Sequence, residues 1–350
     1  MRLVRPALVL AALAALLPLT SASAVGTFGA AHTVSPGGCS DLVSGIGTDG
    51  KTRGFLNCFS GARFVQGTAT SFTSAAAPAV KGQVLAVAVG GTTTYYLEST
   101  STGLYLRSRT STGTYTAGHR LSTSAPDGGA ALIASGNQWW AVWTVANSQS
   151  GFNLWESHTL GATVSSHRFE GSATSQVADT APSLAWQSAT KTAVLVWAHG
   201  ASQGTLGTVL ATSKGGAWTK ARSVDSAGSA GVVATYGTSV AIATFHGTRV
   251  DTFVGTTTGA FATHLLSTKG YVYRNPRIAY SSGRIDVAWT DKSSSSGAVV
   301  PRLAERSGST WTETSFTSPA GATVLDVQSI AARARVFFER TSTDVVARAQ

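Results

Sequence analysis

Charged residues and strong helix formers are scarce in this chain of 350 residues. Only 12% of the residues are charged, and Glu and Lys occur just six and seven times. Methionine occurs once, as the first residue, and cysteine occurs twice. Such a low charge content excludes a coiled coil and an ordinary disordered chain. Two cysteines are also too few for a small scaffold built on disulfides.

The abundant residues are glycine, serine, threonine and apolar residues. The chain holds 38 glycines, and 43% of its residues are apolar. Serine and threonine together make up roughly a quarter of the chain, a mixture typical of strands joined by tight turns. We therefore expect an all-β protein.

The N-terminus has the layout of a secretory signal. Arg2 and Arg5 precede an apolar run over residues 7–19, and the small residues Ala22 and Ala24 follow. A run of about 13 apolar residues is short for a membrane span, which needs about 20. We expect residues 1–24 to be a cleaved signal peptide. The mature protein, residues 25–350, would then be secreted and extracellular, with no membrane anchor.

The two cysteines of the mature chain, Cys39 and Cys58, are expected to form one disulfide, as is usual in exported proteins. No Cys-x-x-Cys or His-x-x-x-His spacing occurs, so the sequence predicts neither a metal site nor a cofactor. The net charge of +10 falls to +8 when Arg2 and Arg5 leave with the signal. Because the basic residues form no patch, we expect a mild attraction to anionic polymers and no nucleic-acid binding.

An apolar, β-branched run that closes on a threonine or an aromatic residue recurs along the chain. Its copies lie 45 to 54 residues apart and are marked by Tyr96, Trp143, Trp197, Thr244, Trp289 and Phe337. A repeat of about 48 residues, each with four short strand candidates, is the size of one blade of a β-propeller. Residues 330–335 could be read as a helix, but their place in the repeat predicts strand.

The two ends of the chain supply complementary parts of one blade. Candidates for the fourth strand of a blade lie near Phe28, Phe72, Tyr115, Val164, Trp218, Phe261 and Trp311. The first of these has no blade before it, whereas the chain ends on a third strand near Val346. We therefore predict a seven-bladed β-propeller in a single domain and a monomer. Its ring would be closed by the N-terminal strand, which completes the C-terminal blade.

Two turns between third and fourth strands resemble the Asp box of sialidases and related BNR-repeat propellers. The pattern Ser-x-Asp-x-Gly-x-Thr-Trp is matched in part by Gly308, Thr310 and Trp311, and by Gly215 and Trp218. Arg306 and Ser213 replace its aspartate, so the box is degenerate. The resemblance implies the propeller fold, in which this turn is structural. It also makes a sialidase-like glycoside hydrolase an alternative, although the family's Arg-Ile-Pro motif is absent from the first blade.

Titratable residues recur where the second strand of a repeat ends, namely Glu98, His199, His246, Asp291 and Glu339. Antiparallel alternation would place all of them on one face of the ring, together with Cys39 and Cys58. Site residues often lie on loops held by a rigid scaffold, so this face is a candidate binding rim. The alternative is that strand ends simply meet water.

The loop at residues 269–275 differs from its counterparts, which are mostly Ser, Ala and Gly. It contains Tyr271, Tyr273 and Arg274. Tyrosine rings stack on sugars and arginine donates hydrogen bonds to hydroxyls and carboxylates, but these tyrosines could equally cover a blade edge. Our leading hypothesis is a propeller that binds a glycan or a cell-surface or cell-wall polymer without turnover. The alternatives are the hydrolase named above and an extracellular scaffold for protein interactions.

Overall fold

A computed structural model describes residues 28–35, 38–161, 163–171, 176–201, 205–228, 230–246, 248–266, 271–292, 297–316, 322–330, 333–339 and 345–350. The expected signal peptide, residues 1–24, lies outside them. The described residues form β-strands and no helix. Accordingly, no helix long and apolar enough to cross a membrane occurs among them.

Most strands belong to antiparallel sheets of four, in which consecutive strands pair. The first sheet contains β2 (Cys39–Ile46), β3 (Thr52–Cys58), β4 (Arg63–Gly67) and β5 (Phe72–Ala76). The second contains β6 (Gln83–Gly90), β7 (Thr93–Thr100), β8 (Gly103–Arg109) and β9 (His119–Ser122). Two later sheets contain β18 (Gly231–Tyr236), β19 (Ser239–Phe245), β20 (Val250–Thr256) and β21 (Ala262–Leu266), and β22 (Tyr271–Ser281), β23 (Arg284–Lys292), β24 (Val299–Ser307) and β25 (Thr310–Ser315).

An eight-stranded sheet lies between these groups along the chain. Its first half contains β10 (Ala130–Ser135), β11 (Gln138–Ala146), β12 (Phe152–His158) and β13 (Val164–Glu170). Its second half contains β14 (Val177–Gln187), β15 (Thr192–Ala201), β16 (Leu206–Ser213) and β17 (Arg222–Asp225). The halves are joined by one parallel pair, Phe152 opposite Ala178. Each half is therefore itself an antiparallel four-stranded unit.

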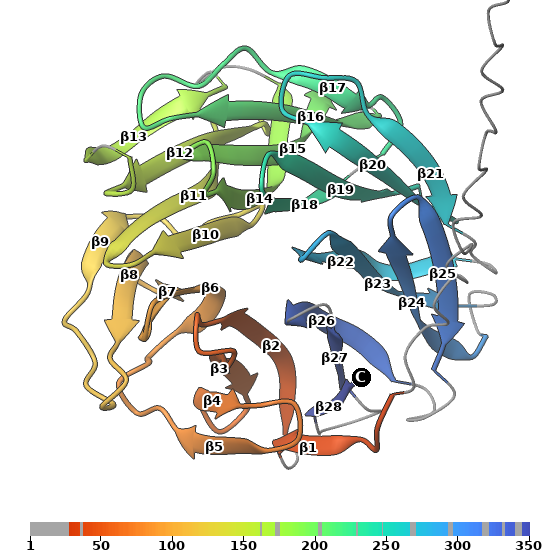
Figure 1. The fold of residues 1–350 in the computed structure, drawn as a ribbon. Helices are drawn as coiled ribbons and strands as arrows, with labels where there is room; N and C mark the ends of the chain where they lie inside the picture. The colour runs from red at the N-terminus through yellow and green to blue at the C-terminus, as the bar shows by residue number, and fades with distance from the viewer. Residues whose placement is uncertain are drawn as a thin grey trace, which may run out of the picture.

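The last sheet combines the two ends of the described chain. It contains β26 (Thr323–Ile330), β27 (Arg333–Glu339), β28 (Val345–Ala349) and β1 (His32–Ser35). β1 runs antiparallel to β28, with Thr33 opposite Val346. Figure 1 shows these four-stranded units around a common centre. The innermost strands are β2, β6, β10, β14, β18, β22 and β26, and the outermost are β5, β9, β13, β17, β21, β25 and β1.

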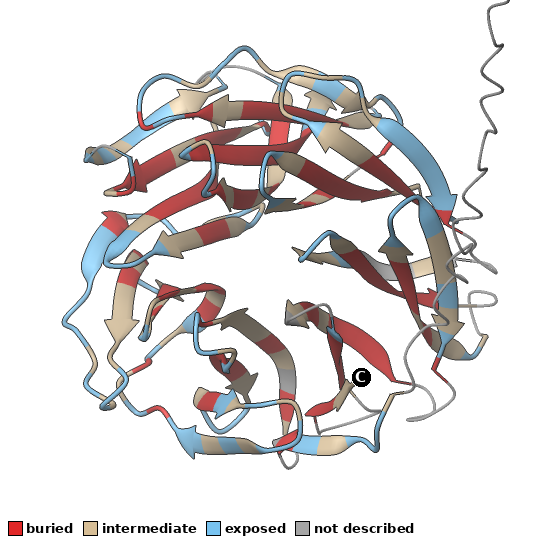
Figure 2. Ribbon diagram, in the orientation of Figure 1, coloured by how far each residue is buried: buried red, intermediate tan, exposed pale blue. Residues whose placement is uncertain are grey.

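The hydrophobic core lies between neighbouring sheets. Trp143 of β11 packs with Leu97 and Leu106 of the preceding sheet, for example. Trp143, Trp197 and Trp289 are at most 1% exposed, as expected for residues of the repeated apolar run. Figure 2 shows burial concentrated on the middle strands, while the outermost strands face solvent. Burying an aromatic or aliphatic side chain of this size stabilises a fold by about 1.5–3 kcal/mol.

Some strand boundaries differ from the sequence prediction. Trp218 was expected to begin a strand but precedes β17, because a turn closed by Thr219 and Thr212 comes first. Tyr115 makes only an isolated bridge to Arg109 before β9 begins. Residues 330 and 333–335 are in strands, in agreement with the repeat and not with a helix.

The predicted disulfide is confirmed. Cys39, the first residue of β2, is bonded to Cys58, the last residue of β3. The two residues also face one another in the strand register, so the bond closes the open end of a hairpin.

Candidate functional site

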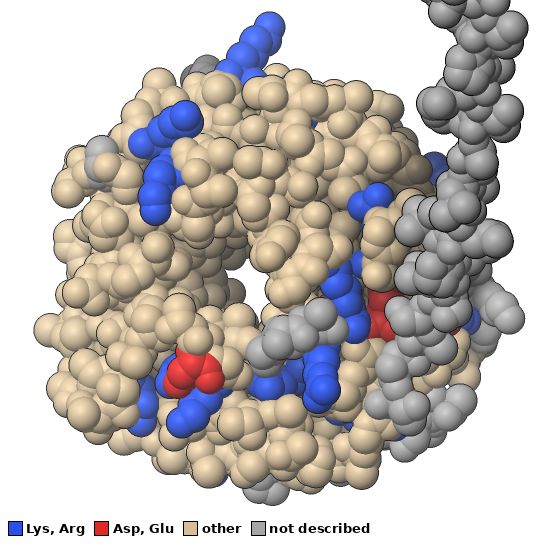
Figure 3. All heavy atoms as spheres, in the orientation of Figure 1, with Lys and Arg blue, Asp and Glu red and all other residues tan. Residues whose placement is uncertain are grey.

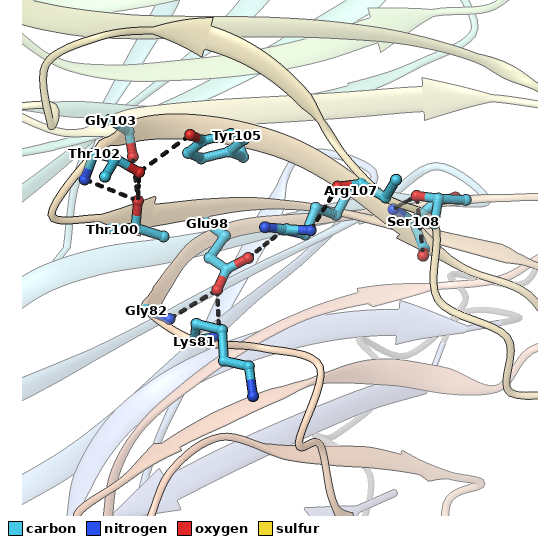
Figure 4. A network of polar contacts seen from close by, with 11 residues as sticks. Lys81, Gly82, Glu98, Thr100, Thr102, Gly103, Tyr105, Arg107 and Ser108 are labelled. Carbon is cyan, nitrogen blue, oxygen red and sulfur yellow. Dashed lines mark hydrogen bonds and ion pairs between the residues drawn. The ribbon is translucent and has the colours of Figure 1, made fainter.

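The titratable residues expected at strand ends do occupy the carboxyl ends of the second strands of their sheets. Their surroundings differ, however. Glu98 is fully buried; its carboxylate accepts hydrogen bonds from the backbone amides of Lys81 and Gly82 and pairs with Arg107 (Figure 4). This carboxylate holds the backbone just before β6 in place. Because it is buried against these partners, it does not face solvent.

Asp291 is similarly occupied. It is 1% exposed, accepts a hydrogen bond of 2.8 Å from the indole nitrogen of Trp289, and pairs with Arg302. Glu339 is partly buried and accepts a bond of 3.4 Å from Thr323. Both carboxylates therefore hold the ends of their own sheets together.

The candidates from the loop at residues 269–275 are Tyr271, Tyr273 and Arg274. Their backbone belongs to β22, with Val272 between them opposite Asp291, but their side chains lie outside the described residues. Their role in binding stays a prediction.

His199 is the exposed member of the set, with 43% of its side chain accessible. Its Nδ1 lies 2.7 Å from Oδ1 of Asp179, which is fully buried on β14 and also accepts a bond from the indole of Trp197. Because a carboxylate can only accept, Nδ1 carries a proton and donates it to this bond. The buried aspartate thus orients an exposed histidine.

His246 lies between two carboxylates. Its Nε2 is 2.7 Å from Oδ2 of Asp225 and 2.9 Å from Oδ2 of Asp251. Burial favours the neutral form of Asp225, but hydrogen bonds from Thr244, the amide of Ala227 and His246 outweigh it and lower the pKa of this carboxyl.

A groove of about 750 Å³ lies between β12–β13 and β15–β17. Its aromatic wall is formed by Trp218 and Phe169, whose rings stack with centroids 5.3 Å apart. Its polar lining includes Glu156, His167 and His199. Close to these strands, Gly161 meets the turn that holds Gly215. A Cβ on Gly161 would lie 3.1 Å from the Cα of Gly215, and its φ of +86° suits glycine.

Glu156 organises the wall of this groove. Its Oε2 accepts bonds of 2.8 Å from the indole of Trp140 and 3.0 Å from that of Trp218, and its Oε1 lies 3.3 Å from Nε2 of His167. Burial raises the pKa of the Glu156 carboxyl, and these hydrogen bonds only partly offset that effect. The arrangement fixes Trp218 at the groove with its ring partly exposed.

Comparison with known proteins identifies the architecture. No known family model matches the chain, and no curated protein matches it in sequence. Among solved structures, the BP39L lectin of Burkholderia pseudomallei is similar over 89% of this chain and 96% of its own, with a TM-score of 0.64 and 15% identity. The fold is that of a β-propeller.

Other similar structures are propellers with different roles. The virginiamycin B lyase of Staphylococcus aureus has a TM-score of 0.58 and 11% identity, over 93% of this chain and 99% of its own. The Cps50 propeller domain of Myceliophteria thermophila has a TM-score of 0.54 and 9% identity, over 91% and 98%. At such low identity these likenesses establish the propeller fold and no function.

Sequence reasoning found His199 but missed the groove residues Glu156, His167 and Phe169 and the buried partner of His199, Asp179. The groove is assembled from strands of two neighbouring blades, β12–β13 and β15–β17, which no local motif links. Trp218 was noted as part of an Asp-box-like turn and as the start of a fourth strand, but not as a binding residue. A search for aromatic residues in or next to the outer strands of adjacent repeats could have found the pair Phe169 and Trp218.

Proposed function

We propose that the protein is a closed, seven-bladed propeller that binds a saccharide of an extracellular glycan or cell-surface polymer. Counting each half of the eight-stranded sheet as one blade gives seven four-stranded blades. The pairing of β1 with β28 supports closure by the N-terminal strand. So do contacts between the last and first sheets: Ser44 donates to Asp326 at 2.6 Å, and Thr52 donates to Gln328 at 2.6 Å.

Binding is assigned to the groove between β12–β13 and β15–β17, and the observation that carries it is the fixed, partly exposed Trp218. Indole faces stack on the apolar faces of sugar rings, while polar neighbours bond to the hydroxyls. His167 and His199 are exposed beside this ring and can supply those bonds. Two hydrogen-bonded indoles on Glu156 preorganise the wall, which lowers the entropy lost on binding.

Charge and the disulfide support an extracellular partner. The mature chain would carry a net charge of +8, and Figure 3 shows Lys and Arg scattered over the visible face with little acid beside them. A broad positive potential attracts anionic polymers without choosing among them. The Cys39–Cys58 bond is of the kind that forms in exported proteins.

A glycan array tests the binding site. We expect wild-type protein and Trp311→Ala to bind the same glycans, and Trp218→Ala to lose them. Trp311 is the matched control because it fills the equivalent position of another repeat and stacks on His264, outside the groove. Circular dichroism should show that both variants are folded. Equal binding by both variants would remove the groove assignment.

The expected rim remains a second contact surface within this proposal. Titratable residues at the strand ends include His199, which already lines the groove, and residues 271–274 are on β22. If Trp218→Ala keeps glycan binding and the Tyr273→Ala/Arg274→Ala double variant loses it, the rim is the binding site and the groove is not. Binding of proteins but no glycan would favour the interaction scaffold.

Turnover of the bound saccharide is a second candidate function, favoured by the His199–Asp179 pair. A buried carboxylate that holds a histidine with a free Nε2 is the arrangement of a general base. Oδ2 of Asp179 has no hydrogen-bond partner among the described residues. Such a base could serve hydrolysis or elimination. Incubation with the bound glycan and with a fluorogenic sialoside separates the cases: intact glycan and no fluorescence mean binding alone.

A further inference from the structure

A second site lies at the junction of the sheets β14–β17 and β18–β21. Asp225 ends β17, His246 directly follows β19, and Asp251 is the second residue of β20. Each can offer one ligand atom, and these three atoms lie within 4.8 Å of one another. Among the described residues, these three form the one group of His, Cys and acidic side chains with this spacing.

The three atoms converge on a shared position. Nε2 of His246 is 2.7 Å and 2.9 Å from the two carboxylate oxygens, and it can carry at most one proton. If the ring is neutral and Nε2 carries the proton, that single N–H has to serve two carboxylates. If Nε2 carries no proton, its lone pair faces both carboxylates. A cation bound by all three atoms would instead accept one lone pair from each of them. The side chains are only 9% to 12% exposed, so water screens the two negative charges poorly.

The surrounding chain holds these ligands in place. The backbone amide of His246 donates to the carbonyl of Arg249 at 2.9 Å, which closes the turn after β19. Asp225 is oriented by Thr244 Oγ1 at 2.7 Å and by the amide of Ala227 at 3.0 Å. Hydrogen bonds of this kind, from neighbours that do not themselves touch the ion, orient the ligands at metal sites. A Cβ on Gly228 would lie 2.3 Å from Oδ2 of Asp225, so only glycine leaves that oxygen accessible.

We infer that Asp225, His246 and Asp251 bind a divalent transition-metal cation, with Zn²⁺ as the best match, that links two adjacent blades. One imidazole and two carboxylates suit Zn²⁺ and related ions, whereas Ca²⁺ and Mg²⁺ prefer oxygen ligands alone. Arg249 lies 3.3 Å from Oδ2 of Asp251 and is half exposed, so it can swing away when a cation enters. The sequence predicted no metal site, because these ligands come from three separate segments and show no ligand spacing along the chain.

This site is independent of glycan binding, and its test is direct. Protein made without a histidine tag and treated with a chelator is titrated with Zn²⁺ in a calorimeter. We expect one equivalent to bind and to raise the melting temperature. Asp225→Asn and His246→Gln should each weaken binding by tenfold or more. His119→Gln is the matched control, because His119 is exposed on β9 of another sheet and belongs neither to this site nor to the groove; it should bind as wild type does.

Co²⁺ provides a readout that needs no variant. Its visible absorption should show a low-coordinate site with nitrogen and oxygen ligands when it is added to wild-type protein, and equimolar Zn²⁺ should abolish the bands. Ca²⁺ or Mg²⁺ at the same concentration should leave them unchanged. Absence of both the Co²⁺ bands and stoichiometric Zn²⁺ uptake would overturn the inference and leave His246 as a hydrogen-bonded bridge between the two carboxylates. Equal uptake by His246→Gln would overturn it as well.

Discussion

At the scale of single residues, polar side chains inside this protein mostly hold aromatic and backbone groups in place. Glu98, Asp179 and Asp291 are each at most 1% exposed, and each accepts hydrogen bonds from an indole or from backbone amides. The recurrent carboxylates could be predicted from the sequence as a repeated position. Their inward direction could not, because the sequence pattern does not show which donor from another strand lies opposite.

Glu156 should make the unfolding free energy of the protein depend on pH. Burial raises the pKa of its carboxyl above the usual 4.5, so the folded protein keeps the proton to a higher pH than the unfolded chain does. Stability from this group is therefore lost as pH rises through the raised pKa. The unfolding free energy of Glu156→Gln, measured relative to that of wild type, should therefore be higher at about pH 7 than at about pH 4.

Urea unfolding at both pH values measures this difference. Glu170→Gln is the matched control, because Glu170 lines the same groove without being buried. A Glu156→Gln difference from wild type that stays constant with pH would show that the carboxyl does not titrate differently in the folded state.

At the scale of elements, strands were easier to predict than their ends. The apolar, β-branched runs that end near Trp197 and Trp289 became the buried strands β15 and β23. The strand expected from Trp218 begins only at Arg222. The indole of Trp218 donates a hydrogen bond to Glu156 of another blade. A local pattern of alternating residues holds no information about such a long-range contact.

The disulfide should stabilise the hairpin β2–β3. Cys39 and Cys58 are 19 residues apart, and the chain-entropy estimate for a loop of this size is about 3 kcal/mol. The Cys39→Ser/Cys58→Ser double variant should lose stability of that order in urea unfolding. An unchanged midpoint would mean that the bond adds nothing to the native fold.

Removal of β1 should expose β28. Deletion of residues 25–35 takes away the strand that pairs with β28 and the buried Val34, which packs with Phe337 and Val345. An unpaired edge templates other strands, so light scattering should report aggregation and the melting temperature should fall. The chain beginning at residue 25 is the control. Identical behaviour of the two chains would contradict closure by β1.

At the scale of the whole molecule, repetition made the fold predictable and the site difficult to predict. A period of about 48 residues defines the blade, and blades stack through apolar faces that every repeat supplies. A binding groove instead depends on how one blade differs from its neighbours. Trp218 and Trp311 hold equivalent positions, yet only Trp218 is joined by a glutamate and lines the described groove.

The most direct measurement of the central claim is titration calorimetry with a glycan selected by wild-type protein on the array. The account predicts that Trp311→Ala binds it with wild-type affinity. Trp218→Ala should lose at least about 1.4 kcal/mol, a tenfold increase in Kd, through the lost stacking surface. Unchanged affinity in a folded Trp218→Ala variant would contradict the account.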